Sequence, residues 1–270
     1  ETAYYLGANV EGVKRAFRSG KLRKEQMISL SPRSAAKNLV VYSTSLSPAF
    51  NVWENLKTYV AQSIRLAGNL GLRKVAIALN TDEALPFIGK AVEGALLGSY
   101  AFDRYKEEAR EQKKRLNRIT VDLIGLKAND QQNRHYLNRY TTVSEGVNLA
   151  RDLINEPGSV VIPEKLAETA RQIGLAEQLD VKVWDEKQLV KEGFTGLLQV
   201  GKGSVHKPRL IRLKYTASGS NKCLALVGKG VTFDTGGISL KPARFMEEMK
   251  YDMAGSAVVV GLLKTLALRK

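Results

Sequence analysis

Short apolar runs with the spacing of buried strands alternate with longer segments of helical spacing along this 270-residue chain. Runs at 37–43 and 73–79 predict buried strands, and segment 52–70 between them carries apolar residues at helical intervals. A second helix is predicted at 85–102, and a further strand at 119–126. This alternation is typical of α/β proteins, so we predict an α/β fold.

The chain is long enough to hold two domains. The first α/β block ends near residue 128, after a mostly charged segment at 103–118 that we interpret as a solvated helix end or loop. The polar residues at 129–134 lack periodicity, which predicts a domain boundary. We therefore predict an N-terminal α/β domain at 1–140 and a second domain at 141–270.

The second domain is expected to continue the alternation of helices and strands. Its first helix has Ser144 as a candidate cap and is predicted to end at Asn155, ahead of a Glu-Pro-Gly turn. A second helix is predicted to start at Ile162-Pro163, because proline is accepted in a first turn. The predicted elements are helices at 142–154 and 162–173, strands at 181–184, 210–215 and 223–227, and an apolar helix beginning near Met253.

Composition restricts the class of protein. With 44 % hydrophobic and 26 % charged residues the chain has an ordinary globular composition. Its apolar runs, such as Ala257–Leu263, are too short to cross a bilayer, and no signal segment is apparent. The single cysteine, Cys223, argues against a disulfide-stapled secreted scaffold. We therefore expect a cytoplasmic protein without a membrane partner.

The formal net charge of +15 leaves two interpretations open. A basic surface favours anionic partners such as nucleic acid, through long-range attraction and counterion release. The charge is better explained by solvated helix faces, or by acidic segments outside this sequence that balance it, because the chain carries no basic motif interleaved with aromatic residues. Nucleic-acid binding is therefore kept as an alternative hypothesis.

Three other kinds of site find little support. Gly196–Gly203 matches a phosphate-binding loop up to its lysine but then has glycine where Ser or Thr must hold magnesium, so a glycine-bounded turn is predicted. His135 and His206 lie in polar, loop-like surroundings without a partner at metal-ligand spacing, so both are predicted on the surface. Neither a cysteine nucleophile nor a serine triad has its motif in this sequence.

The strongest candidate is a glycine-rich stretch of two lysines and two aspartates, Lys229, Asp234, Lys241 and Asp252. It follows the strand predicted at 223–227, and ligands collect where strands of open α/β sheets end. Two aspartates on converging loops are able to hold divalent cations, and a nearby dication would lower the pKa of a lysine amine. Turn and helix capping by the aspartates, with solvated lysines, is the alternative interpretation.

The exact amino-acid sequence of this stretch is more informative than the spacing of its lysines and aspartates. VGKGVTFDTGGISLKP (227–242) and MEEMKYDMAGSAVV (246–259) resemble the signature of the leucine aminopeptidase family, cytosol aminopeptidases with two metal ions. NLARDLINEPGSVVIPEKLAETA (148–170) resembles the entry to that family's catalytic domain. The resemblance implies a small macro-like N-terminal domain followed by the first part of a mixed-sheet metallopeptidase domain.

The resemblance also implies a role for each matching residue. Lys229 and Asp252 correspond to ligands of the more tightly held metal ion, and Asp234 corresponds to the carboxylate that bridges both ions. Lys241 corresponds to the catalytic lysine, and Met249 to a residue that lines the pocket for the substrate's first side chain. These five residues would contact the substrate, although Met249 could also be a core residue.

The reaction implied is release of leucine-like N-terminal residues from peptides by water that two Mn²⁺ or Zn²⁺ ions activate. The family completes its site with an Asn-Thr-Asp-Ala-Glu-Gly-Arg segment that this sequence lacks. We therefore expect a fragment that also begins inside the N-terminal domain and is inactive alone. The complete protein is expected to be a homohexamer, with a DNA-binding protein on the same scaffold as the alternative and an inactive structural paralogue as a third hypothesis.

Overall fold

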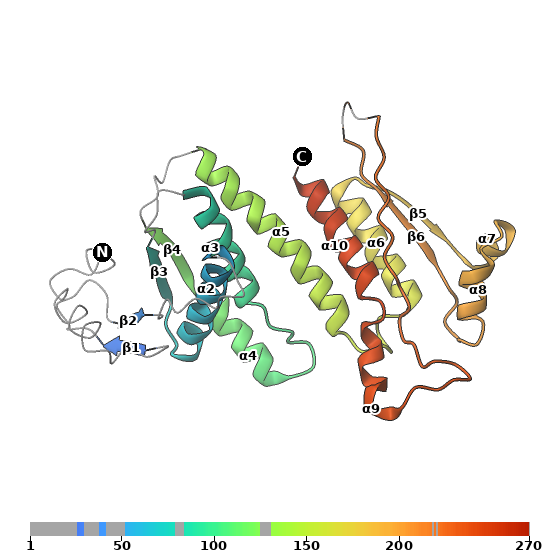
Figure 1. The fold of residues 1–270 in the computed structure, drawn as a ribbon, viewed down its shortest axis with the longest axis horizontal. Coiled ribbons are helices and arrows are strands. Elements are labelled where there is room, and N and C mark those ends of the chain that lie inside the picture. The colour runs from blue at the N-terminus through green and yellow to red at the C-terminus, as the bar shows by residue number, and fades with distance from the viewer. Residues whose placement is uncertain are drawn as a thin grey trace. The chain divides into compact units, whose positions relative to one another are not determined.

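The chain folds into two compact units, Glu1–Thr141 (unit 1) and Thr142–Lys270 (unit 2) (Figure 1). The computed structural model describes residues 26–29, 38–41, 52–78, 84–124, 131–217, 219 and 221–269. Helices and short strands occur in both units, which confirms the predicted α/β class. That the units correspond to a macro-like domain and a catalytic domain stays a prediction.

The described residues of unit 1 form two strand pairs and three helices ahead of the long helix α5. The antiparallel pair is β1 (Gln26–Ser29) with β2 (Asn38–Val41), and the parallel pair is β3 (Lys74–Ala78) with β4 (Thr120–Ile124). The helices are α2 (Val52–Asn69), α3 (Ala84–Gly98) and α4 (Glu107–Leu116). The strands predicted at 37–43, 73–79 and 119–126 and the helices at 52–70 and 85–102 are confirmed within the described residues.

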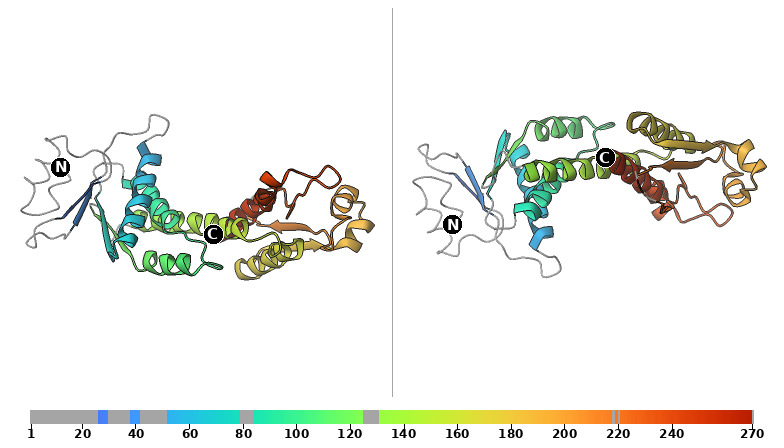
Figure 2. Two further views of the ribbon diagram at one scale, coloured as in Figure 1. Left: turned by 90° about the horizontal axis from the view of Figure 1, so that it is seen from below. Right: turned by 90° about the horizontal axis from the view of Figure 1, so that it is seen from above.

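The core of unit 1 lies between the β3–β4 pair and the helices that connect and cover it (Figure 2). Parallel strands need a long crossover, and α3 and α4 lie in the connection between β3 and β4. Val60 and Ile64 of α2 and Ala91 of α3 are buried against Val75 and Ile77 of β3. The apolar spacing that predicts these elements is therefore the spacing of their buried faces.

Unit 2 is built on one antiparallel strand pair, β5 (Asp180–Trp184) with β6 (Leu210–Lys214). Val181 lies opposite Leu213 on one face, and Lys182 lies opposite Arg212 on the exposed face. The apolar face packs against helices α6 and α10. The helices of this unit are α5 (Gln131–Asn155, from its residue 142), α6 (Pro163–Glu177), α7 (Glu186–Lys191), α8 (Thr195–Gly201), α9 (Ala243–Met246), the 3₁₀ helix η2 (Glu247–Tyr251) and α10 (Ala254–Leu268).

Helix α10 is strongly apolar and lies beside α6 in unit 2 (Figure 1). Its residues Ala257, Val260 and Leu263 are buried in the cores that also hold α6. By length and composition alone, the stretch Ala243–Leu268 is long and apolar enough to cross a membrane, and the mean hydropathy of its most apolar 18-residue window is 1.3. It combines α9, η2 and α10, and 39 % of that window is buried inside the protein.

The predicted linker at 129–134 and the predicted helix start at 142 are wrong where the structure describes them. Residues 131–134 form the first turn of α5, which continues unbroken to Asn155. Their polar side chains are mostly exposed, so this turn needs no apolar periodicity. Ser144 is a buried mid-helix residue rather than a cap.

The strand predicted at 223–227 is also wrong, because this segment has no regular secondary structure. Its apolar side chains are exposed, with Leu224 at 84 % and Val227 at 95 %. A strand forms only where a neighbour pairs with its backbone, and β6 pairs only with β5 among the described residues. The predictions for 103–118 and 196–203 need correction too, since these segments contain the helices α4 and α8.

Candidate metal centre

The four ionisable residues of the glycine-rich stretch meet in two ion pairs. The Lys229 amine lies 2.9 Å from Oδ1 of Asp252, which ends η2 just before α10. The Lys241 amine lies 2.9 Å from Oδ2 of Asp234 and 2.7 Å from the sulfur of Met249. The structure thus brings all five predicted site residues into pairwise contacts with one another, two of them at η2 just before α10, while their roles stay predictions.

A tight turn holds the Asp234 carboxylate in place. Its Oδ1 accepts a hydrogen bond of 2.9 Å from the Gly236 N–H, and the Lys241 N–H donates to the Thr235 carbonyl at 3.0 Å. Gly236 has a φ of 90°, which residues with a side chain rarely adopt. The two bonds close a loop that presents the Asp234 carboxylate and the Lys241 amine to each other.

Electrostatics couple the two pairs. The hydrogen bond with Asp252 raises the pKa of Lys229, and the nearby Asp234 carboxylate contributes to this rise. The hydrogen bond from Lys241, together with the Gly236 N–H, lowers the pKa of Asp234, and Lys229 lowers it further. Lys229 is therefore an ammonium and Asp234 a carboxylate at neutral pH, each within range of the other's charge.

Buried anchors fix the elements that carry these groups. Met253, directly after Asp252, is fully buried in the core that Ala150 and Leu166 share. The Lys250 amine donates to the Asn155 carbonyl at 3.1 Å, which ties η2 to the end of α5. Asp252 is consequently held from both sides in the sequence.

The oxygen atoms of Asp252 differ in their surroundings. Oδ1 accepts from Lys229, whereas Oδ2 is buried and has no hydrogen-bond partner. A buried carboxylate oxygen without a donor costs about 1–3 kcal/mol, so it is suited to a cation. Across the part of the chain that the structure describes, no group of three or more His, Cys, Asp or Glu residues could hold a metal ion. The residues therefore fit one side of a metal site.

Sequence reasoning missed the residues that hold the main chain of this site. The Ser256 N–H donates to the Lys229 carbonyl at 2.8 Å, and Gly228 packs against Gly255. The signal that could have found them is the run of small residues, Ala254-Gly255-Ser256, at the start of an apolar helix. Small residues there allow another backbone to approach closely.

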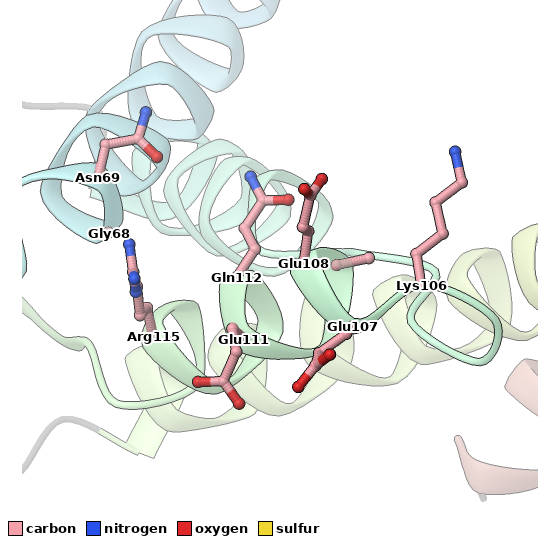
Figure 3. A pocket seen from close by; sticks show the side chains of 9 residues that line it. Gly68, Asn69, Lys106, Glu107, Glu108, Glu111, Gln112 and Arg115 are labelled. Atoms are coloured by element: carbon pink, nitrogen blue, oxygen red, sulfur yellow. The ribbon is translucent and has the colours of Figure 1, made fainter.

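The other candidate locations carry less chemistry. His135 and His206 are exposed, as predicted, although His135 lies on α5 and not in a loop. The phosphate-loop match is helical within α8, so its backbone does not form the loop that cradles phosphate. A hollow of about 650 Å³ in unit 1, between α4 and the end of α2, is lined by charges of both signs (Figure 3). None of the five predicted site residues lines it.

Comparison with known families agrees with the resemblance that the sequence motifs indicate. Residues 148–270, nearly all of unit 2, match the family described as "Cytosol aminopeptidase family, catalytic domain". The chain belongs to the cytosol aminopeptidase family. The expected family is thereby confirmed, and the match begins in the part of α5 that lies in unit 2.

Relatives of this family cover most of the chain. A "Probable cytosol aminopeptidase" of Streptomyces avermitilis is 41 % identical over 241 residues, which is 87 % of this chain and 47 % of the relative. One of Syntrophotalea carbinolica is 42 % identical over 79 % of this chain and 42 % of its own length. The chain thus spans about half the length of the curated relatives it matches.

Solved structures of the family share the fold. A mutant of tomato leucine aminopeptidase has a TM-score of 0.75 and 26 % sequence identity. The match covers 97 % of this chain and 50 % of the tomato chain. The bottromycin maturation enzyme BotP in complex with Mn has a TM-score of 0.72 and 29 % sequence identity. The match covers 93 % of this chain and 53 % of the BotP chain. Neither self-association nor DNA binding is shown, and the nucleic-acid-binding alternative finds no support in these names.

Proposed function

We propose that this chain is part of a two-metal aminopeptidase that releases apolar, leucine-like N-terminal residues from peptides. The observation that carries the proposal is that Lys229, Asp234, Lys241 and Asp252 form two 2.9 Å ion pairs, Lys229 with Asp252 and Lys241 with Asp234. The family of the chain supports it, because the matched relatives are named cytosol aminopeptidases and BotP is described with Mn.

The residues present would hold one side of the metal site. Lys229, as a neutral amine whose pKa the dication would lower, and Asp252 would bind one Mn²⁺ or Zn²⁺ ion, to which Asp252 offers its buried and unpartnered Oδ2. Asp234 would help to hold the ions through its carboxylate, which lies in the same stretch. Two carboxylates alone do not complete a two-metal site, so we propose that the remaining ligands lie in the part of the relatives that this chain does not cover.

The bound ions would lower the pKa of a water molecule and polarise the peptide carbonyl. The chain's own residues would orient the peptide carbonyl and stabilise the charge that develops on it. Lys241 is a cation fixed by Asp234 at 2.9 Å, so its amine is able to stabilise negative charge that develops on the carbonyl oxygen. Asp234 keeps this amine in place, because its other oxygen is anchored by the Gly236 N–H.

Substrate selection is proposed to involve Met249. Its sulfur lies 2.7 Å from the Lys241 amine, so the thioether and the catalytic lysine border the same space. A flexible, polarisable side chain accommodates apolar groups of different shape. The first side chain of a peptide would therefore contact Met249 while its carbonyl contacts Lys241.

We also propose a cytoplasmic location and a homohexameric assembly for the complete protein. The location rests on the names of its relatives, which are cytosol aminopeptidases. The assembly rests on the family resemblance.

The proposal is tested by measuring metal stoichiometry and leucinamide hydrolysis on two proteins: this 270-residue chain and the full-length protein of its reading frame. We expect two tightly bound ions and turnover for the full-length protein, and neither for the chain alone. Ordinary turnover with two tightly bound ions in the 270-residue chain would contradict the incomplete site. A full-length protein without metal-dependent hydrolysis would contradict the aminopeptidase function.

A further inference from the structure

The backbone around Lys229 lies directly on the first turn of α10. A Cβ added at Gly228 would lie 2.4 Å from the Gly255 carbonyl oxygen. A Cβ added at Gly255 would lie 2.9 Å from the Lys229 nitrogen and 3.4 Å from its carbonyl oxygen. Neither glycine has a left-handed φ, so each position requires glycine for space and not for conformation.

This close approach allows one hydrogen bond to form. The N–H groups of the first helical turn lack partners inside the helix, and Ser256 is the third residue of α10. The Ser256 N–H donates to the Lys229 carbonyl at 2.8 Å. The start of α10 therefore holds the main chain of Lys229, while Asp252, just before the helix, holds its amine at 2.9 Å.

The two glycines that flank Lys229 have different surroundings. A Cβ at Gly230 would lie 3.4 Å from the side-chain atoms of Ser256, at the edge of ordinary contact. The corresponding Cβ at Gly228 would collide with rigid backbone. Only the glycine before Lys229 is thus part of the close backbone contact.

We propose that the Gly228–Gly255 contact positions Lys229. Because Gly255 has no side chain, the Lys229 main chain lies close enough for its carbonyl to accept a hydrogen bond from the Ser256 N–H. Gly228 and Gly255 are positioning residues, since they act through Lys229 and carry no ligand atom themselves. The inference rests on the proposed function for its consequence, because Lys229 is there a metal ligand. Its geometric part stands on the contacts alone.

The first test measures the geometry by amide hydrogen exchange of Ser256 in the full-length protein. The 2.8 Å hydrogen bond predicts slow exchange of this amide in the unchanged protein. Gly255→Ala should accelerate it, since the added methyl group pushes the Lys229 backbone away. Exchange of Ser256 that does not change in Gly255→Ala would overturn the inference, whatever the protein's function.

The second test measures the consequence by Mn²⁺ titration of the full-length protein. Loss of a group that orients a metal ligand typically weakens binding by about 10- to 100-fold, and we expect this for Gly255→Ala. The same substitution in a Lys229→Ala background should change Mn²⁺ affinity by less than about 3-fold, because the residue through which it acts is gone.

Gly261→Ala is the matched control for damage to the helix. A Cβ at Gly261 would lie 2.4 Å from the Gly146 carbonyl oxygen, so this change disturbs α10 as severely but at its packing against α5. It should lower Tm and leave Mn²⁺ affinity of the folded protein within about 3-fold, as expected for sites without shared partners. If Gly255→Ala does not fold, Gly228→Ala tests the same contact from the loop.

The remaining outcomes separate the inference from the proposed function. If Lys229→Ala weakens Mn²⁺ binding but neither Gly255→Ala nor Gly228→Ala does, the positioning role is wrong and the metal site stands. If Lys229→Ala leaves Mn²⁺ binding unchanged, the proposed ligand is wrong and the functional part of the inference falls with it. Equal weakening by Gly255→Ala with and without Lys229 would also overturn the positioning role.

Discussion

The Lys229 amine contacts Oδ1 of Asp252 at 2.9 Å, while Oδ2 of the same carboxylate is buried without a partner. One oxygen of Asp252 is thus already compensated by a cation, and the other is not. The arrangement costs stability in the absence of a further cation, because the buried Oδ2 has lost water and gained no donor. It favours the interpretation of Asp252 as a metal ligand.

Asp252→Asn is predicted to weaken Mn²⁺ binding by the full-length protein by about 100-fold or more, since it removes a charged ligand. Isothermal titration calorimetry measures the affinity. Asp180→Asn is the control, because Asp180 forms an exposed 2.8 Å ion pair with Arg212 in the same unit. An equal loss of affinity in both variants would contradict a specific role for Asp252.

Lys241→Ala is predicted to lower kcat for leucinamide by about 100- to 1,000-fold, as expected when a group that stabilises an oxyanion is removed. Mn²⁺ affinity should fall by less than about 10-fold, because Lys241 is not a proposed ligand. Steady-state kinetics and titration calorimetry separate the two effects. The exposed Lys202 provides a control, and Lys202→Ala should retain kcat. An unchanged kcat in Lys241→Ala would rule out the catalytic role.

Gly236→Ala is predicted to destabilise unit 2 by about 1–3 kcal/mol, the typical cost of a left-handed conformation for a residue with a side chain. Its φ is 90°, and a Cβ would also lie 2.3 Å from the Ser239 carbonyl oxygen. Urea unfolding followed by Trp184 fluorescence, in a Trp53→Phe background, reports unit 2 alone.

Gly196→Ala is the matched control for that measurement. Gly196 lies in α8, has no left-handed φ, and nothing lies within 4 Å of a Cβ built there. Alanine in a helix is favoured over glycine by about 0.5–1 kcal/mol, so this variant should be as stable as the unchanged protein or more so. Similar destabilisation by both changes would show that Gly236 has no special conformational role.

Glu54 predicts a pH dependence for unit 1. Hydrogen bonds from Lys57 and then Lys90 lower the pKa of Glu54 from 4.5 to about 2. A carboxyl group whose pKa is lower in the folded than in the unfolded state stabilises the folded state when the pH is above the unfolded pKa. This contribution to the free energy of unfolding is lost as pH falls from about 4.5 toward 2. Glu54→Gln should therefore cost about 1 kcal/mol at pH 7 and almost nothing at pH 2.

This dependence is measured by urea unfolding followed by Trp53 fluorescence in a Trp184→Phe background. Glu108→Gln serves as the control, because Glu108 is exposed and forms no ion pair within the described residues. A cost for Glu54→Gln that persists unchanged at pH 2 would contradict the linkage to the Glu54 carboxylate.

Local periodicity predicts the elements that bury one face within their own unit. The alternation in β5 and β6 matches an apolar face against α6 and α10, and the helical spacing of α2 matches its buried face. The prediction fails at 223–227, since strand formation depends on a pairing partner and not on the segment alone. It also fails at 131–134, where an exposed helical turn needs no apolar residues.

The sequence proposes which residues form the candidate site, but it does not predict how they contact one another. The spacing of Lys229, Asp234 and Asp252 is compatible with a metal site and also with simple capping of turns and helices. Only the resemblance of the surrounding sequence to the family signature favours the metal site. That Asp252 leaves one oxygen without a partner depends on contacts between segments, as does the capture of the Lys229 carbonyl by Ser256. Such contacts have no local sequence pattern.

Lys229 and Asp252 are proposed to form one side of a two-metal aminopeptidase site. The most direct test titrates Mn²⁺ into the metal-free full-length protein and follows leucinamide hydrolysis together with the number of bound ions. We predict two ions per chain at full activity, and loss of both ion binding and hydrolysis when Lys229→Ala and Asp252→Asn are combined. Full activity in that double variant, or in the metal-free protein, would contradict the account.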